Sequence, residues 1–88
     1  MVEQVVTIQN RLGLHARACS VFVKEAARFA SHITVMRDGL EVNGKSILGV
    51  MMLAAEMGAQ ITLRAEGSDE LGALAALVRV VNDKFGEE

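Results

Sequence analysis

The chain has 88 residues, a net charge of −2 and a hydrophobic share of 51%. This length suits one domain, residues 1–88, and the apolar share excludes a disordered chain. We expect no nucleic-acid partner, because Lys and Arg are scattered and the only aromatic residues are three Phe, whereas nucleic-acid binders present a basic face or stacking aromatics. The sequence shows no basic leader, no apolar run of about 18 residues and only one cysteine. These features predict a cytoplasmic protein without a membrane span.

A strand and a glycine-containing loop come first. Residues 2–9 are rich in β-branched side chains, and Val6 and Ile8 alternate with polar neighbours. This period of two predicts a strand with one buried face. Residues 10–14 then form a loop, in which Gly13 can adopt a positive φ.

A helical period begins at Ala16. Apolar residues recur every three or four positions, opposite a polar and charged face. This predicts an amphipathic helix that ends near Phe29 or Ala30. The apolar stripe comprises Cys19, Phe22, Val23, Ala26, Phe29 and Ala30.

A hairpin is expected next. Residues 32–37 alternate, with Ile33 and Val35 on the inner face, and the pair Asp38–Gly39 leads into residues 40–42. Asp-Gly between two such runs is a strong signal for a two-residue turn. We therefore expect the second and third strands to be antiparallel neighbours.

The second half of the chain contains two more helices and one strand. Ser46 is in position to cap a short apolar helix over residues 47–55, which Gly58 is expected to end. Residues 60–66 alternate cleanly and predict the fourth strand. Residues 67–70 predict a turn and the start of a long helix, with acidic residues where the helix dipole favours them. Its apolar stripe comprises Leu71, Leu74, Leu77, Val78, Val81 and Phe85.

The expected order of elements is therefore βαββαβα. Alternating strands with helices on one side describe an α+β fold, with a four-stranded, mostly antiparallel sheet and three helices on one face. No internal repeat, linker or second domain is visible in the sequence.

His15 is the first candidate for chemistry. It follows the Gly13 turn at the start of a predicted helix, and Arg17 comes two residues later. A helix start favours an anion, imidazole is nucleophilic near neutral pH, and Arg can bind phosphoryl oxygens through two hydrogen bonds. The pattern suits a phosphoryl group on His15, although a His at a helix start is more often a simple polar cap. His32 is expected to be an ordinary surface residue.

Ser46 and the helix after it are the second candidate. Ser46 is adequate as a cap, and a phosphate there would change the charge of a nearby face. If Val50, Leu53 and Ala54 face the core, the remaining apolar side chains of this helix are partly exposed and would form a docking surface. We call these residues the apolar cluster: Ile47, Leu48 and Met51. Cys19 is expected to pack in the core. Neither metal-ligand spacing nor a P-loop is present, so no metal or cofactor is expected.

A resemblance to a known family rests on two motifs: residues 13–17 (Gly-Leu-His-Ala-Arg) and residues 43–51 (Asn-Gly-Lys-Ser-Ile-Leu-Gly-Val-Met). Both are similar to the HPr family of phosphocarriers in the bacterial phosphoenolpyruvate-dependent phosphotransferase system. The likeness covers nearly the whole chain, including the closing helix after Gly67. It implies the HPr-like open-faced β-sandwich, in agreement with the order of elements above.

The resemblance also implies a function. Enzyme I, charged from phosphoenolpyruvate, would phosphorylate Nδ1 of His15, and enzyme IIA domains would then take the phosphoryl group in sugar uptake. Arg17 would hold the phosphate and the apolar cluster would contact the partners. An HPr kinase/phosphorylase would modify Ser46 in some bacteria and so hinder docking. Such a protein is expected to be a monomeric carrier and not a stand-alone enzyme.

One position departs from the family pattern. The family usually has Pro after His-Ala-Arg, whereas this chain has Ala18 and no proline at all. Proline in a first helical turn fixes φ and removes an amide that is unpaired anyway. Ala18 should therefore loosen the helix start slightly without touching the nucleophile, which bears on transfer rate and partner preference.

Two other functions stay open at this point. One is a regulatory paralogue, either nitrogen-type or switched at Ser46, that acts through protein–protein contacts. Paralogues without carrier activity typically lack the histidine, so His15 and Arg17 count against a protein switched at Ser46 alone. A nitrogen-type paralogue would use the same histidine chemistry with a regulatory output and stays open. The other is a ferredoxin-like small-molecule, metal or RNA module, suggested by the order of elements alone. The chain lacks the Cys-x-x-Cys or sheet aromatics that such modules use.

Overall fold

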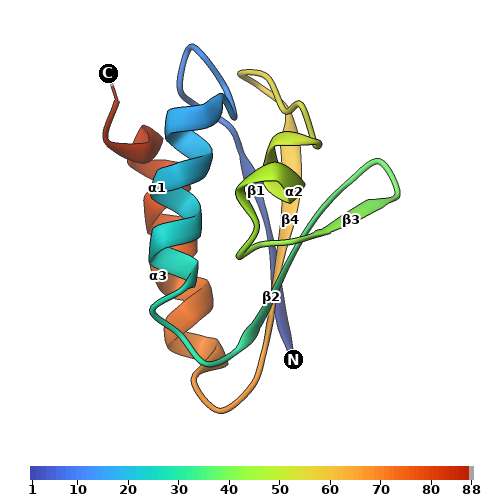
Figure 1. Ribbon diagram of the computed structural model, residues 1–88, viewed down its shortest axis with the longest axis vertical. Coiled ribbons are helices and arrows are strands. Elements are labelled where there is room, and N and C mark those ends of the chain that lie inside the picture. The colour runs from blue at the N-terminus through green and yellow to red at the C-terminus, as the bar shows by residue number, and fades with distance from the viewer. Residues whose placement is uncertain (88) are drawn as a thin grey trace.

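The computed structural model describes residues 1–87 and has two layers, a four-stranded sheet and the helices that pack on one of its faces (Figure 1). The strand order is β1-β4-β2-β3, and each neighbouring pair is antiparallel. The elements are β1 (Val2–Thr7), α1 (Ala16–Ala26), β2 (His32–Arg37), β3 (Leu40–Asn43), α2 (Ile47–Met51), β4 (Gln60–Glu66), α3 (Glu70–Asn82) and a 3₁₀ turn, η1 (Lys84–Gly86). The predicted fold class and order of elements are confirmed.

The alternation along the strands separates the two faces of the sheet. The central strand β4 buries Ile61, Leu63 and Ala65. The register places Val6 of β1 beside Ile61 and Val35 of β2 beside Leu63. Because every second side chain of a strand points to the same face, these residues form one continuous apolar surface. The helices pack on this face of the sheet.

The predicted hairpin is also confirmed. β2 and β3 are antiparallel, and Arg37 is paired with Leu40 across the turn. Both turn residues have positive φ, 51° at Asp38 and 85° at Gly39. This combination defines a type I′ turn, whose twist matches that of the flanking strands.

Helices α1 and α3 lie side by side over the sheet (Figure 1). α1 ends at Ala26, earlier than the predicted Phe29 or Ala30. Beyond it the amides of Arg28 and Phe29 bond to carbonyls only three residues back, so the last turn tightens. The Asp69 carboxylate accepts from the Ala30 amide at 2.9 Å and takes the chain out of the helix. Apolar spacing does not encode this tertiary contact.

α2 is much shorter than predicted. It ends at Met51 instead of Ala55, and Gly58 lies in the loop beyond it. Ala54 adopts φ 48°, a left-handed conformation that no helix continues through. Arg37 holds this arrangement, since its guanidinium donates to the carbonyls of Leu53 and Ala54.

α3 differs from the prediction at both ends. Leu71 is 73% exposed and does not belong to the buried stripe, which consists of Ala73, Leu77 and Val81. Phe85 is buried as predicted, but it lies in η1, beyond the end of the helix. Lys84 and Phe85 have positive φ, so the chain turns back after α3. This turn brings the C-terminal segment beside the start of α1 (Figure 1).

The helices of this fold are short. Within residues 1–87, none combines the length and the apolar character needed to cross a membrane. The start of α1, the loop after α2 and the C-terminal turn lie together at one end of the structure (Figure 1).

Candidate functional site

His15 is the N-cap residue of α1. Its backbone is extended, with φ −79° and ψ 177°, and its side chain does not cap the helix. The first bond of the helix runs from the Cys19 amide to the His15 carbonyl at 3.0 Å. The amides of residues 16–18 therefore point out of the helix start without a partner in the described part of the chain. They leave a partial positive charge beside the imidazole.

The loop before His15 is held by the loop after α2. The Leu14 amide donates to the Ala55 carbonyl at 2.9 Å. Gly13 has φ 66°, and a Cβ at this position would lie 2.5 Å from the same carbonyl oxygen. A side chain cannot be accommodated there without moving backbone, so glycine is required both for its φ and for this close approach.

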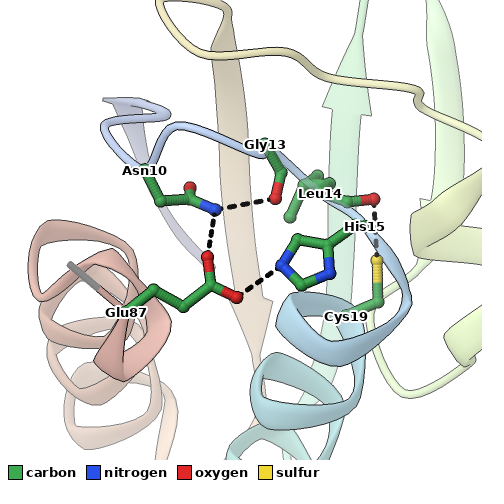
Figure 2. A network of polar contacts seen from close by, with 6 residues as sticks. All are labelled: Asn10, Gly13, Leu14, His15, Cys19 and Glu87. Atoms are coloured by element: carbon green, nitrogen blue, oxygen red, sulfur yellow. Dashed lines mark hydrogen bonds and ion pairs between the residues drawn. The ribbon is translucent and has the colours of Figure 1, made fainter.

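A carboxylate from the other end of the chain contacts the imidazole. Glu87 Oε2 pairs with Nε2 of His15, and Glu87 Oε1 accepts a 2.9 Å hydrogen bond from Nδ2 of Asn10 (Figure 2). The same Asn10 nitrogen donates to the Gly13 carbonyl at 2.8 Å. Asn10 is fully buried, and its Oδ1 has no partner among the described residues. The His15 side chain is 29% exposed and that of Glu87 is 18% exposed, so solvent and partners can still reach the ring.

The charges around Glu87 favour its ionised form. The hydrogen bond from Asn10, followed by the hydrogen bond and charge of His15 and the charge of Arg17, holds the pKa of the Glu87 carboxyl below its ordinary value. At neutral pH Glu87 is thus an anion that faces Nε2 of the imidazole.

Arg17 lies beside Glu87 and makes no hydrogen bond to the imidazole. It lines a surface cavity of about 550 Å³ whose other lining residues are Arg11, Leu12, Phe85, Gly86 and Glu87. Arg11 and Arg17 form no ion pair with any residue in the range 1–87. The structure therefore brings Glu87 to His15 and leaves two guanidinium groups at the rim, where they can meet an anion.

The second candidate region lies on α2, which packs against α1. Ser46 Oγ accepts from the Gly49 amide at 3.1 Å, so its predicted role as N-cap is confirmed. The apolar cluster is exposed: Ile47 to 41%, Leu48 to 75% and Met51 to 37%. Exposed apolar side chains gathered on one short helix are typical of a contact surface.

Cys19 and His32 play no part in the site. Cys19 is fully buried, and its Sγ donates to the Leu14 carbonyl at 3.4 Å. Burial raises the pKa of this thiol to about 11, which makes the reactive thiolate scarce. His32 begins β2 and is exposed. The expectation that Cys19 packs in the core is confirmed, and no group of three potential metal ligands occurs within residues 1–87.

Sequence reasoning missed Asn10 and Glu87. The sequence predicts only a loop at Asn10 and no role for Glu87. The two residues are 77 positions apart, so no local pattern could connect them. The one available signal was Gly86, a residue suited to a sharp turn directly after the apolar Phe85.

Comparison with known proteins identifies the family of this chain. The family model for the PTS HPr component phosphorylation site matches residues 2–83. Phosphocarrier protein HPr of Treponema pallidum is 47% identical over 88 residues, which are 100% of both chains. The crystal structure of HPr from Thermoanaerobacter tengcongensis superimposes with a TM-score of 0.96, at 46% identity over 100% of this chain and 99% of that one. The crystal structure of the Bacillus subtilis protein Crh, a domain-swapped dimer, superimposes with a TM-score of 0.77. Its sequence is 44% identical over 96% of this chain and 97% of that one. The chain therefore belongs to the HPr family of phosphocarrier proteins of the phosphotransferase system.

Proposed function

We propose that His15 accepts a phosphoryl group on Nδ1 from phosphorylated Enzyme I and passes it to enzyme IIA domains in sugar uptake. The observation that carries this proposal is that the two imidazole nitrogens have different surroundings. Nε2 is occupied by Glu87, whereas Nδ1 makes no hydrogen bond within the described residues and lies over the first turn of α1 (Figure 2). A phosphoryl group on Nδ1 would sit at the positive end of that helix.

The chemistry is an in-line displacement at phosphorus. The Nδ1 lone pair forms the new nitrogen–phosphorus bond while the bond to the donor breaks, and its electron pair stays with the donor. The open amides of residues 16–18 and the guanidinium of Arg17, which lies on the same side of the molecule as Glu87, would bind the oxygens of the transferring group. They would stabilise the charge of the transferring group without forming covalent bonds themselves.

Docking would use the apolar cluster. Its exposure at α2, which packs against the helix that begins after His15, supports one face for both donor and acceptor. Partners that bind one face in turn must dissociate between transfers, so we expect small and transient contacts. Phosphorylation of Ser46 by an HPr kinase/phosphorylase would add a dianion at this face and would weaken docking.

We propose that the carrier acts as a monomer in the cytoplasm. A related protein, Crh of Bacillus subtilis, forms a swapped dimer. Light scattering after size exclusion at micromolar concentration separates the two states. A mass of about twice 9.4 kDa would refute the monomer and leave the phosphocarrier chemistry untouched.

The alternative to the carrier function is a regulatory paralogue that acts through protein–protein contacts. The arrangement around His15 favours the carrier.

The experiment is incubation with radiolabelled phosphoenolpyruvate and Enzyme I. We expect a label that is stable in base and labile in acid, as a phosphohistidine is. His15→Ala should abolish it, and the matched control His32→Ala should keep it, because His32 is an exposed strand residue remote from the network. Label that persists in His15→Ala, or is absent from the wild-type chain, would refute the proposal.

A further inference from the structure

We propose that Glu87 is a positioning residue that keeps the hydrogen of the neutral His15 ring on Nε2 and so leaves the lone pair on Nδ1. This inference rests on the proposed function, since it concerns the nitrogen that receives the phosphoryl group. A carboxylate without a proton can only accept hydrogen bonds, so a ring nitrogen paired with it must carry the hydrogen. The contact between Glu87 Oε2 and Nε2 therefore selects one tautomer.

Glu87 is held in place by the fold. Phe85 is 4% exposed and anchors the C-terminal turn in the core. Gly86 has φ 80°, which lets the chain reverse direction directly after this anchor. The amides of Gly86 and Glu87 then bond to the carbonyls of Asp83 at 3.0 Å and Lys84 at 2.9 Å. The carboxylate is thus carried on a hydrogen-bonded turn with a buried side chain at its centre.

Asn10 determines which oxygen of the Glu87 carboxylate faces the imidazole. The Gly13 carbonyl can only accept, so the Asn10 amide must turn its NH₂ group toward it. The second hydrogen of the same NH₂ group goes to Glu87 Oε1. The opposite orientation of the amide would set two acceptors against each other at 2.8 Å. Each oxygen of Glu87 therefore faces a donor, Oε1 the amide of Asn10 and Oε2 the imidazole.

An amide at position 87 cannot reproduce this arrangement. In Glu87→Gln, the side-chain oxygen must remain opposite the NH₂ of Asn10, which places the new NH₂ group against Nε2 of His15. A donor at that position requires a lone pair on Nε2 and moves the ring hydrogen to Nδ1. The substitution keeps size and shape and reverses the tautomer. Glu87→Ala removes the contact and leaves both tautomers accessible.

The carboxylate also suits the transfer itself. When the Nδ1 lone pair forms the bond to phosphorus, the hydrogen on Nε2 stays in place and the ring gains positive charge. The anionic Glu87 faces that charge across the Nε2–H bond. In the reverse direction the bonding electron pair returns to Nδ1 and the phosphoryl group leaves for the acceptor, again with no proton transferred. The contact between Glu87 and Nε2 therefore supports both steps, the phosphorylation of His15 and the transfer to the acceptor.

The first test reads the tautomer directly. Nitrogen-15 NMR of the imidazole, at a pH where the ring is neutral, distinguishes a protonated from an unprotonated ring nitrogen. We expect Nδ1 to be unprotonated in the wild-type chain and protonated in Glu87→Gln, with averaged signals in Glu87→Ala. His32→Gln leaves a single histidine and identifies the resonances. An unchanged Nδ1 resonance in Glu87→Gln would refute the proposal.

The second test compares the rates of phosphoryl transfer from Enzyme I. We expect Glu87→Gln to be slower than wild type by on the order of tenfold, and Glu87→Ala to lie between them. This order is informative because a merely structural role would make the conservative amide the milder change. The matched control is Glu66→Gln, an exposed glutamate at the end of β4 that carries no part of the site.

The two tests separate this inference from the proposed function. If wild type is labelled and Glu87→Gln is labelled equally fast, the positioning role is refuted and the carrier stands. If Enzyme I labels no variant, the carrier proposal fails, and the NMR result still decides the tautomer. Thermal unfolding of each variant shows whether the fold is kept.

Discussion

Replacing Ala54 by glycine should stabilise this protein. Ala54 has φ 48°, where an L-residue is strained by about 1–2 kcal/mol and glycine is not. Glycine also has more conformational freedom in the unfolded chain, which lowers the free energy of unfolding by about 0.4–1 kcal/mol. Ala54 is exposed, so its methyl group contributes no buried surface. Its amide keeps the 3.0 Å bond to Met51, and its carbonyl keeps the 2.9 Å bond from Arg37.

The net effect is the difference between these two terms. We expect Ala54→Gly to raise the free energy of unfolding by about 0.5–1 kcal/mol, which in a domain of this size corresponds to a Tm increase of about 2–8 °C. The matched control is Ala75→Gly, at an exposed position inside α3, where the same change should lower stability by about 0.5–1 kcal/mol. Urea and thermal unfolding by circular dichroism measure both. Equal destabilisation in the two variants would show that the left-handed strain at Ala54 is absent.

Two further substitutions and one labelling experiment test other parts of the structure. Phe85→Ala should lower the free energy of unfolding by about 3 kcal/mol, measured in urea, because it empties a buried site. Asp69 has a lowered pKa, chiefly because the Ser31 hydroxyl and the Ala30 amide donate to it, so its stabilising effect is present at neutral pH and is lost as the pH falls through the folded-state pKa. Urea midpoints of wild type and Asp69→Asn should therefore differ at pH 7 and converge in acid; a constant gap would contradict this assignment. Cys19 should react with a thiol reagent only in denaturant, because it is buried with a pKa of about 11; rapid labelling of the folded protein would contradict this.

The sequence predicted β2 and β4 with the bounds that the structure has, residues 32–37 and 60–66. Their period of two is a local property, because the pleat places alternate side chains on opposite faces whatever the rest of the chain does. The turn at Asp38–Gly39 was predictable for a similar reason, since few residue pairs tolerate two positive φ values.

The helix ends were predicted less well, and each error has a tertiary cause. α1 ends at Ala26, and in the segment that follows Asp69 accepts from the Ala30 amide. α2 ends at Met51, and Arg37 donates to the carbonyls of Leu53 and Ala54 just beyond it. In both cases a distant side chain satisfies backbone groups that would otherwise continue the helix, and apolar spacing carries no information about that competition.

The sequence by itself determined the order of elements, the inner face of the sheet and the two motifs that contain His15 and Ser46. All of these depend on neighbours within a few residues. Only the tertiary structure decided what the imidazole contacts. Glu87 is 72 residues from His15, and it reaches the ring because Phe85 is buried and the chain reverses after α3. Spacing in the sequence reports local geometry, whereas a contact across the whole chain exists only once the core has packed.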